Sequence, residues 1–439
     1  MKYYMHRNFN MYLSQLISRS ILSKYFSVFF LFFFLCFPLS NVKAAVLEVC
    51  PLCNFSSIHR AVEQAQAGDV IEVQKGEYAE PALRIEKPLT LKGLNRPVID
   101  GQHLGNVILI VADQVKVEGF IIRNSGQSLL QEFAGIRAEK VKNCELRNNF
   151  FENNNYSIYL AKVDTCKIEN NIAEGNAKGE VTGGNGLHAW YSLYLQISNN
   201  QFKKHRDGIY LEFTTDSNIE KNLSTKNIRY GLHFMYSHRN RYFGNSFIDN
   251  QTGVAVMYSR QIEMRENTFE KSWGRSSYGL LLKDISDSVV DSNFIKGNTI
   301  GLFADEISRD QFQYNTFQDN GWAIQILGSS SQNSFVGNNF LNNYFNVATN
   351  GHENENQFEG NYWNDYQGYD LDRDGAGDVP FRPMKIFSLW VSQYPELVIL
   401  LGSPVISFLE VAEKIFPVLT PKTLQDNHPS MKLLGATKG

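Results

Sequence analysis

Short apolar strands separated by corners that carry asparagine or glycine repeat along most of this 439-residue chain. A phrase of asparagine, a variable residue and a large apolar residue recurs between residues 148 and 363, mostly every 22 or 23 residues. Between its copies a glycine leads another apolar strand, as at 208–211 and 231–234. Asparagine and glycine tolerate left-handed backbone at corners, and so short a period without helical spacing is typical of a solenoid. The pattern predicts an all-β, right-handed parallel β-helix of about twelve coils over residues 45–363, with asparagine side chains bonded to one another along its axis.

The two ends of the repeat have a different pattern. Residues 55–68 carry apolar positions at helical spacing, which predicts a helix that caps the first coil, with Ser56 or Ser57 as its N-cap. An Asp-rich loop follows over 364–384. Residues 385–439 are apolar, but prolines break them into helices too short for the roughly 20 residues that a membrane span requires. We expect this tail either to dock onto a membrane partner or to fold back and cap the last coil.

The first 44 residues predict a secretory signal. They hold five Lys or Arg, no acidic residue and an apolar run at 26–37, and they end in Val-Lys-Ala, which favours cleavage after Ala44. The remaining chain has 37 Lys and Arg against 45 Asp and Glu, a net charge of −8, so a nucleic-acid partner is not expected.

Export implies an oxidising compartment for the cysteines. Cys144 and Cys166 are 22 residues apart, one coil, and we expect them to stack at roughly 4.8 Å as free buried thiols, with a strained disulfide as the alternative. For Cys50 and Cys53 a structural disulfide is the favoured interpretation, against a redox-active pair or a soft-metal site.

Strand alternation turns an unusual set of side chains away from the core. The set comprises His233, Met235 and Met257, with Glu212 and His188 nearby. Met235 and Met257 are one period apart, so we expect them on neighbouring coils, and thioether with imidazole suits Cu(I). The alternative is an exposed apolar docking surface without metal.

Two insertions lengthen the period just before the glycine-led strand, at 175–186 and 271–278. Insertions gathered on one side of a solenoid often mark its binding face. We expect both to flank the histidine and methionine column.

The loop after the solenoid reads like the start of a calcium loop. Asp370, Asp372, Asp374 and Asp378 supply oxygen ligands at the usual spacing, although Phe381 stands where the closing Glu belongs. We expect a structural calcium ion there; a solvated acidic turn is the alternative.

Acid–base catalysis would need clustered carboxylates or a comparable set on one wall. Asp207, Glu212 and Arg229 are available, but paired carboxylates do not recur in register and the chain has no nucleophile motif. The sequence therefore predicts a protein that is not an enzyme.

Several motifs together resemble the nitrous-oxide-reductase maturation family NosD. They are the leader, the Phe-Ser-Ser-Ile helix start at 55–58, the segment 67–71, the 22-residue period, the Gly-Asn-Tyr-Trp-Asn box at 360–364 and the Asp-rich loop at 368–378. The resemblance implies a periplasmic maturation factor, held near the membrane by the membrane and ATPase subunits of an ABC transporter. It also implies a copper chaperone as donor and nitrous oxide reductase, with its copper–sulfur centre, as the client. We expect Cu(I) to be received and passed on, and the tail to carry the transporter contact.

Two other functions stay open at this point. One is a secreted polysaccharide-modifying β-helix enzyme of the lyase or epimerase type. The other is a structural adaptor without metal.

Overall fold

A computed structural model describes residues 44–128, 130–181, 183–351, 355–416 and 424–435. The predicted secretory signal lies outside these residues, except for Ala44. No described helix is both long and apolar enough to cross a membrane.

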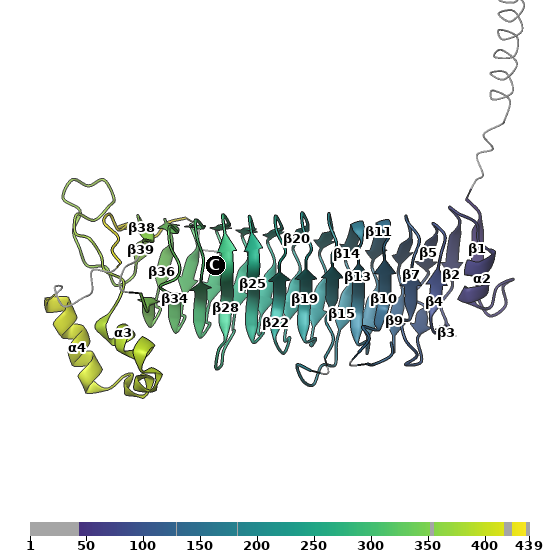
Figure 1. The fold of residues 1–439 in the computed structure, drawn as a ribbon, viewed down its shortest axis with the longest axis horizontal. Helices are drawn as coiled ribbons and strands as arrows, with labels where there is room; N and C mark the ends of the chain where they lie inside the picture. Colours follow the sequence, from purple (N-terminus) through teal and green to yellow (C-terminus); the bar gives the residue numbers. More distant parts are fainter. Residues whose placement is uncertain (1–43, 129, 182, 352–354, 417–423, 436–439) are drawn as a thin grey trace, which may run out of the picture. The chain divides into compact units, whose positions relative to one another are not determined.

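The chain from residue 46 to residue 363 winds into a parallel β-helix (Figure 1). Each full coil gives one strand to each of three parallel sheets, which contain fourteen, twelve and thirteen strands. The longest sheet has fourteen strands, somewhat more than the about twelve coils counted from the sequence. The fold class itself is confirmed.

The strands of the three sheets follow one another along the axis. The first sheet contains β1 (Val46–Val49), β2 (Val70–Val73), β5 (Thr90–Gly93), β8 (Lys116–Glu118), β11 (Lys142–Arg147), β14 (Asp164–Glu169), β17 (Gln196–Ser198), β20 (Asn218–Glu220), β23 (Arg241–Phe243), β26 (Glu263–Arg265), β29 (Val289–Asp291), β32 (Gln311–Gln313), β35 (Ser334–Val336) and β38 (Gln357–Glu359). The second contains β4 (Leu83–Ile85), β7 (Ile108–Ile110), β10 (Ala134–Glu139), β13 (Tyr156–Ala161), β16 (Leu187–Trp190), β19 (Asp207–Glu212), β22 (Tyr230–Met235), β25 (Thr252–Arg260), β28 (Tyr278–Ser286), β31 (Ile300–Asp305), β34 (Trp322–Ile326) and β37 (Phe345–Thr349). The third contains β3 (Glu77–Ala79), β6 (Val98–Asp100), β9 (Ile121–Arg123), β12 (Phe150–Glu152), β15 (Ile172–Glu174), β18 (Gln201–Lys203), β21 (Leu223–Thr225), β24 (Ser246–Ile248), β27 (Thr268–Glu270), β30 (Phe294–Lys296), β33 (Thr316–Gln318), β36 (Asn339–Leu341) and β39 (Tyr362–Trp363).

Inside the solenoid, a ladder of asparagines satisfies the corner between the first and third sheets. Each member donates a backbone and a side-chain N–H to the side-chain oxygen of the next, as Asn200 does to Asn222 at 2.9 and 3.0 Å. The members are Asn149, Asn171, Asn200, Asn222, Asn245, Asn267, Asn293, Asn315, Asn338 and Asn361. The axial bonding expected from the asparagine phrase is present.

Asp426 ends this ladder. Its carboxylate accepts the backbone and side-chain N–H of Asn361 at 2.9 and 3.0 Å, and the Trp363 indole N–H at 3.0 Å. A carboxylate suits the last position because it accepts hydrogen bonds without donating any, and Asn361 directs only N–H donors toward this end of the ladder. The chain therefore returns from the tail to close its own last coil.

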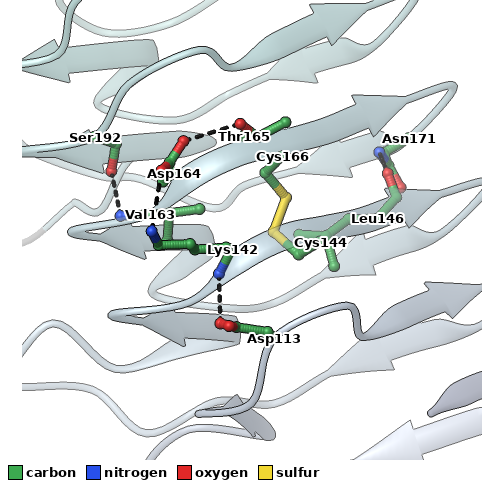
Figure 2. The surroundings of a disulfide bond; sticks show 10 residues. All are labelled: Asp113, Lys142, Cys144, Leu146, Val163, Asp164, Thr165, Cys166, Asn171 and Ser192. Atoms are coloured by element: carbon green, nitrogen blue, oxygen red, sulfur yellow. Dashed lines mark hydrogen bonds and ion pairs between the residues drawn. A yellow bond between two sulfur atoms is a disulfide. The ribbon is translucent and has the colours of Figure 1, made fainter. Parts of the chain in front are cut away.

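Both cysteine pairs form disulfides. Cys50 and Cys53 are bonded, in agreement with the favoured interpretation. Cys144 and Cys166 are register partners in β11 and β14, with Cα atoms 4.5 Å apart, and they too are bonded (Figure 2). The expectation of free thiols here was wrong, because direct register pairing brings the two Cα atoms within the range that a disulfide spans.

The helices lie at the two ends. Helix α2 (Ile58–Gln64) starts after Ser57, as predicted, but the serine side chain makes no capping bond. Instead Glu80 accepts the Ile58 N–H at 2.7 Å. In the tail, α3 (Ile386–Gln393), the 3-10 helix η1 (Pro395–Leu400) and α4 (Pro404–Ile415) follow the last coil.

The tail partly folds back onto the solenoid. Phe387, Val391 and Ile406 form a buried cluster with Phe345 of β37. Among the residues that the structure describes, the outer side of α4 has no such cover: Val405, Phe408 and Ile415 are exposed, Phe408 to 75%. The fold-back alternative is therefore realised in part, since the inner face of the tail packs on the last coils. Docking onto a membrane partner stays a prediction.

Candidate functional site

The outer face of the second sheet carries the side chains singled out from the sequence. Parallel pairing of β16, β19, β22 and β25 aligns them in two columns. One column reads His188, Tyr210, His233 and Ala255; the other reads Trp190, Glu212, Met235 and Met257. Met235 and Met257 are register partners on adjacent coils, as their spacing predicts, and His233 lies two residues before Met235 on the same strand.

The two histidines are not exposed, contrary to the prediction for this face. His188 and His233 point away from the core, yet only 7% and 6% of their surface is accessible. The Tyr210 ring lies between them, 4.6 Å from each ring centroid and nearly parallel to His233. Tyr159 covers the other side of His188 at 4.8 Å, and Tyr230 covers His233 at 4.8 Å. Alternation predicts the direction of a side chain, but not the bulk of its neighbours.

The buried Asp207 and the partly exposed Arg229 form an ion pair beside His233. The Arg229 guanidinium donates Nε to Asp207 Oδ1 at 2.8 Å and Nη2 to Oδ2 at 2.5 Å. Burial alone would raise the pKa of Asp207, but the hydrogen bonds and the charge of Arg229, together with the nearby His233 ring, lower that pKa to about 2. Asp207 is therefore a fixed negative charge, 3.9 Å from His233 Nδ1.

Burial keeps both histidines neutral. It lowers the pKa of His233 despite the opposing influence of Asp207, and it lowers the pKa of His188 despite Glu212, whose Oε2 lies 3.7 Å from His188 Nε2. Neutral imidazole is the form that binds metal. Neither ring nitrogen of either histidine makes a hydrogen bond within the described part of the chain.

The donor set suits a soft cation. Buried imidazole nitrogens without hydrogen bonds stand beside two half-buried thioethers, and this mixture matches Cu(I) better than it matches a hard ion. One competing contact is present: the Tyr210 hydroxyl donates to the Met235 sulfur at 3.5 Å. A metal bound to Met235 would have to displace this phenol. The sequence offered no signal for that contact, because Tyr210 looked like one more outward residue.

An aromatic strip borders the methionine column. Four consecutive coils place Tyr191, Phe213, Tyr236 and Tyr258 at the position directly after the methionine column, with ring centroids 4.6, 5.2 and 4.9 Å apart. All four have left-handed φ values of 47° to 53°, which cost bulky side chains about 1–2 kcal/mol each.

Charged residues occupy the same register position on the flanking coils, with Lys162 before the strip and Asp284 after it, also at positive φ. Tyr191 and Tyr236 are 48% and 40% exposed. Core packing does not account for these rings, whereas an interface would. The strip is therefore a candidate contact surface beside the candidate metal ligands.

The two insertions reach the same face. Glu180 of the first insertion and Tyr278, the last residue of the second, both lie within electrostatic range of Tyr230, which covers His233. Whether they wall a copper ion stays a prediction.

The Asp-rich loop gathers three of its four predicted ligands. Carboxylate oxygens of Asp370, Asp372 and Asp374 all lie within 4.8 Å of one another. Asp378 instead accepts the Leu371 N–H at 2.7 Å, so it fixes the loop rather than joining the group. The oxygen donors suit a hard cation such as calcium. The loop is also bonded to the returning segment, through Gly377 N to Pro429 O at 2.7 Å.

Comparisons with known proteins fit this picture. Residues 179–368 match the family model described as periplasmic copper-binding protein (NosD). Residues 99–202 match the model of the right-handed β-helix region, in agreement with the predicted hand. The chain is 28% identical over 380 residues to a probable ABC transporter binding protein NosD of Stutzerimonas stutzeri, covering 82% of this chain and 86% of that protein. A protein of the same name from Pseudomonas aeruginosa is 29% identical over 371 residues, covering 80% and 86%.

Solved structures resemble the fold across different functions. The catalytic domain of a GH87 α-1,3-glucanase in complex with nigerose gives a TM-score of 0.57 at 12% identity, over 70% of this chain and 67% of that one. PfbA, a surface adhesin of Streptococcus pneumoniae, gives 0.52 at 13% identity, over 69% and 85%. At such identities the likeness shows the fold alone.

Proposed function

We propose, from the premise that this chain is a NosD-type protein, that it acts in the periplasm as a maturation factor for nitrous oxide reductase. In this role it receives Cu(I) from a copper chaperone. It then passes the metal on while working with an ABC transporter that supports assembly of the copper–sulfur centre. The observation that carries the proposal is the pairing of Met235 with Met257 beside a buried, neutral and unbonded His233.

These residues would hold the metal in a way that suits a carrier. His233 offers a nitrogen with no proton to displace near neutral pH, because burial lowers its pKa. Thioethers bind Cu(I) and release it more readily than thiolates, so the ion can move on to an acceptor. Glu212, the register partner of Met235, and His188 are auxiliary candidates one and two coils away. In the same proposed role, the protein handles sulfur together with copper.

Copper binding is tested with the double variant Met235→Leu and Met257→Leu. Leucine keeps the apolar volume and removes the sulfur, so the fold should be retained. We expect Cu(I) affinity to fall by at least about tenfold, equivalent to about 1.4 kcal/mol, in a competition titration against a chromophoric Cu(I) chelator. Met264→Leu is the matched control, because Met264 is fully buried in the core on β26. Unchanged affinity and stoichiometry in the double variant would reject the site.

The transporter contact is assigned to the apolar outer side of α4. Support comes from the exposure of Val405, Phe408 and Ile415 on one helix, and from the relatives' name as ABC transporter binding proteins. Exposed apolar clusters of this kind mark interaction sites. The aromatic strip beside the methionines is the corresponding candidate surface for the copper donor.

The transporter contact cannot be tested by cutting off the tail. A chain ending near residue 383 would also lose Asp426, which closes the asparagine ladder. The triple variant Val405→Ser, Phe408→Ser and Ile415→Ser leaves that closure intact. It should lose co-purification with the transporter subunits while its melting temperature stays unchanged. Leu104→Ser, an exposed apolar position on the solenoid, is the control. Retained co-purification of the triple variant would move the contact to the solenoid wall.

A polysaccharide-modifying enzyme is the weaker proposal. Asp207 is held ionised by Arg229 and has a pKa of about 2, so it cannot serve as a general acid near neutral pH. The relatives are named as binding proteins. We therefore place the function in metal handling and not in glycan chemistry.

A further inference from the structure

The first insertion builds a cavity that the copper proposal does not use. The cavity has a volume of about 160 Å³ and lies between residues 175–186 and the corner after β12. Its polar lining comprises Gln127, Asn154, Asn155, Asn176, Lys178 and His205. A cavity of about 150 Å³ accepts a ring the size of benzene, so this one has room for a single six-membered ring.

Hydrogen bonds to the solenoid hold the walls in place. The backbone N–H of Ala177 donates to Lys204 O at 3.1 Å, and that of Arg206 donates to Gly184 O at 2.9 Å. At Gly184, an added Cβ would lie 1.9 Å from the Asn155 carbonyl oxygen, so only glycine permits this close approach. The insertion is thus anchored on both sides of the cavity.

The lining combines donors with acceptors and carries little charge. The Asn154 amide is already engaged, with Nδ2 donating to Ile122 O at 2.9 Å and Oδ1 accepting the Ser125 N–H at 3.1 Å. Gln127 and Asn155 each present a carboxamide, with a donor and an acceptor side by side. Asn176 adds its amide oxygen, because its nitrogen donates to Asn153 at 2.6 Å.

The remaining two polar side chains narrow the ligand class. His205 is fully buried, its Nε2 lies 3.2 Å from Ala173 O, and burial lowers its pKa to about 4, so the ring is neutral. Lys178 supplies the single positive charge of the lining. An apolar ligand would leave these groups unpaired, and a cation would face the Lys178 ammonium. A hydroxyl group, by contrast, donates and accepts at one atom and matches neighbouring carboxamides.

We propose that this cavity binds one hydroxyl-rich sugar unit, such as the end of a glycan chain. The site shares none of its lining residues with His233, Met235 and Met257. Sugar binding at this cavity is therefore independent of copper binding, and an experiment can refute either of the two proposals without refuting the other.

The experiment titrates the full-length mature chain with glucose, N-acetylglucosamine and glucuronate, followed by ligand-observed NMR. At least one sugar should bind saturably. Gln127→Leu and Asn155→Leu should each weaken that sugar about fivefold, the effect of one lost hydrogen bond, and leave Cu(I) affinity unchanged. Gln311→Leu, an exposed glutamine on β32, is the matched control and should change neither.

Gln127 is exposed in a loop, so its substitution leaves the fold intact even if Asn155→Leu does not. The absence of saturable binding for all three sugars would overturn the proposal. Saturable binding of inorganic phosphate in place of a sugar would also overturn the proposal. A sugar affinity that Gln127→Leu leaves unchanged would do the same.

Discussion

Asp310 stands in a side-chain ladder at a position where the next two coils carry asparagine. The backbone N–H of Ser288 donates to Asp310 Oδ1 at 2.7 Å, and the N–H of Asp310 donates to Asn333 Oδ1 at 2.9 Å. Asn333 and Asn356 also donate their side-chain N–H to backbone carbonyls. Asp310 Oδ2 is buried and has no hydrogen-bond partner among the described residues. We predict that Asp310→Asn stabilises the protein at neutral and alkaline pH.

The magnitude follows from the pKa of this carboxyl. Burial raises the pKa of Asp310 from 3.8 to about 7. The protonated acid is therefore the form that the fold prefers, and its stabilisation is complete below pH 3.8 and lost as the pH rises through 7. At about 1.4 kcal/mol per pH unit, the loss reaches at most about 4 kcal/mol above pH 7. Asparagine carries no charge and supplies the missing N–H donor at every pH.

The assay is urea unfolding of the wild type and of Asp310→Asn at pH 5, 6, 7 and 8. We expect the variant to be more stable than the wild type by about 1–3 kcal/mol at pH 8, and the two to converge toward pH 5. The reverse change, Asn333→Asp, is the matched control and should introduce the same kind of alkaline loss one coil further along. Parallel profiles for Asp310→Asn and the wild type would refute the reasoning.

Three further predictions concern other sites. Tyr210→Phe keeps the ring on His233 and removes the hydroxyl that donates to the Met235 sulfur. Cu(I) affinity, measured by competition with a chelator, should therefore rise about fivefold. An affinity equal to that of the wild type would show that the phenol does not compete with the metal. Asp372→Ala should lower the melting temperature by roughly 2–4 °C in calcium and have no effect in chelator, whereas an equal loss in both would indicate an ordinary hydrogen-bonded turn. Asp426→Ala leaves buried N–H donors unpaired at the last coil, so the free energy of unfolding should fall by about 2 kcal/mol or more. Hydrogen exchange should become faster in the last coils only. Exchange that is faster along the whole solenoid would contradict the closing role of Asp426.

The 22-residue period was sufficient to predict the coils and their register. It placed Met235 beside Met257 and Cys144 beside Cys166, because one period equals one strand spacing along the axis. The asparagine ladder was foreseen as well, although at the first two coils its members are Asn149 and Asn171 and not the preceding asparagines. Those preceding residues take left-handed backbone instead.

Contacts of the coils with distant segments, and the packing of side chains around each position, could not be read from the period. Asp426 lies 65 residues beyond Asn361, and nothing local in the sequence connects them. The burial of His233 depends on how Tyr210 and Tyr230 orient their rings, which alternation does not specify. The Cys144–Cys166 bond likewise required the distance between the two Cα atoms, not only their register.

Burial of the histidines changes how the candidate copper site would work. An exposed histidine has a pKa near 6.5, so protons would compete with copper as the pH falls toward that value. Burial lowers the pKa of His233, and that competition moves to a more acidic range. The same rings that exclude water also restrict access, so in the proposed function a donor protein would deliver the metal at the half-buried methionine side of the column. The aromatic strip lies on that side, directly after Met235 and Met257 in the chain. A thioether entrance, a neutral imidazole behind it and an adjacent aromatic contact surface would together suit the proposed transfer of Cu(I) between proteins better than they would suit storage.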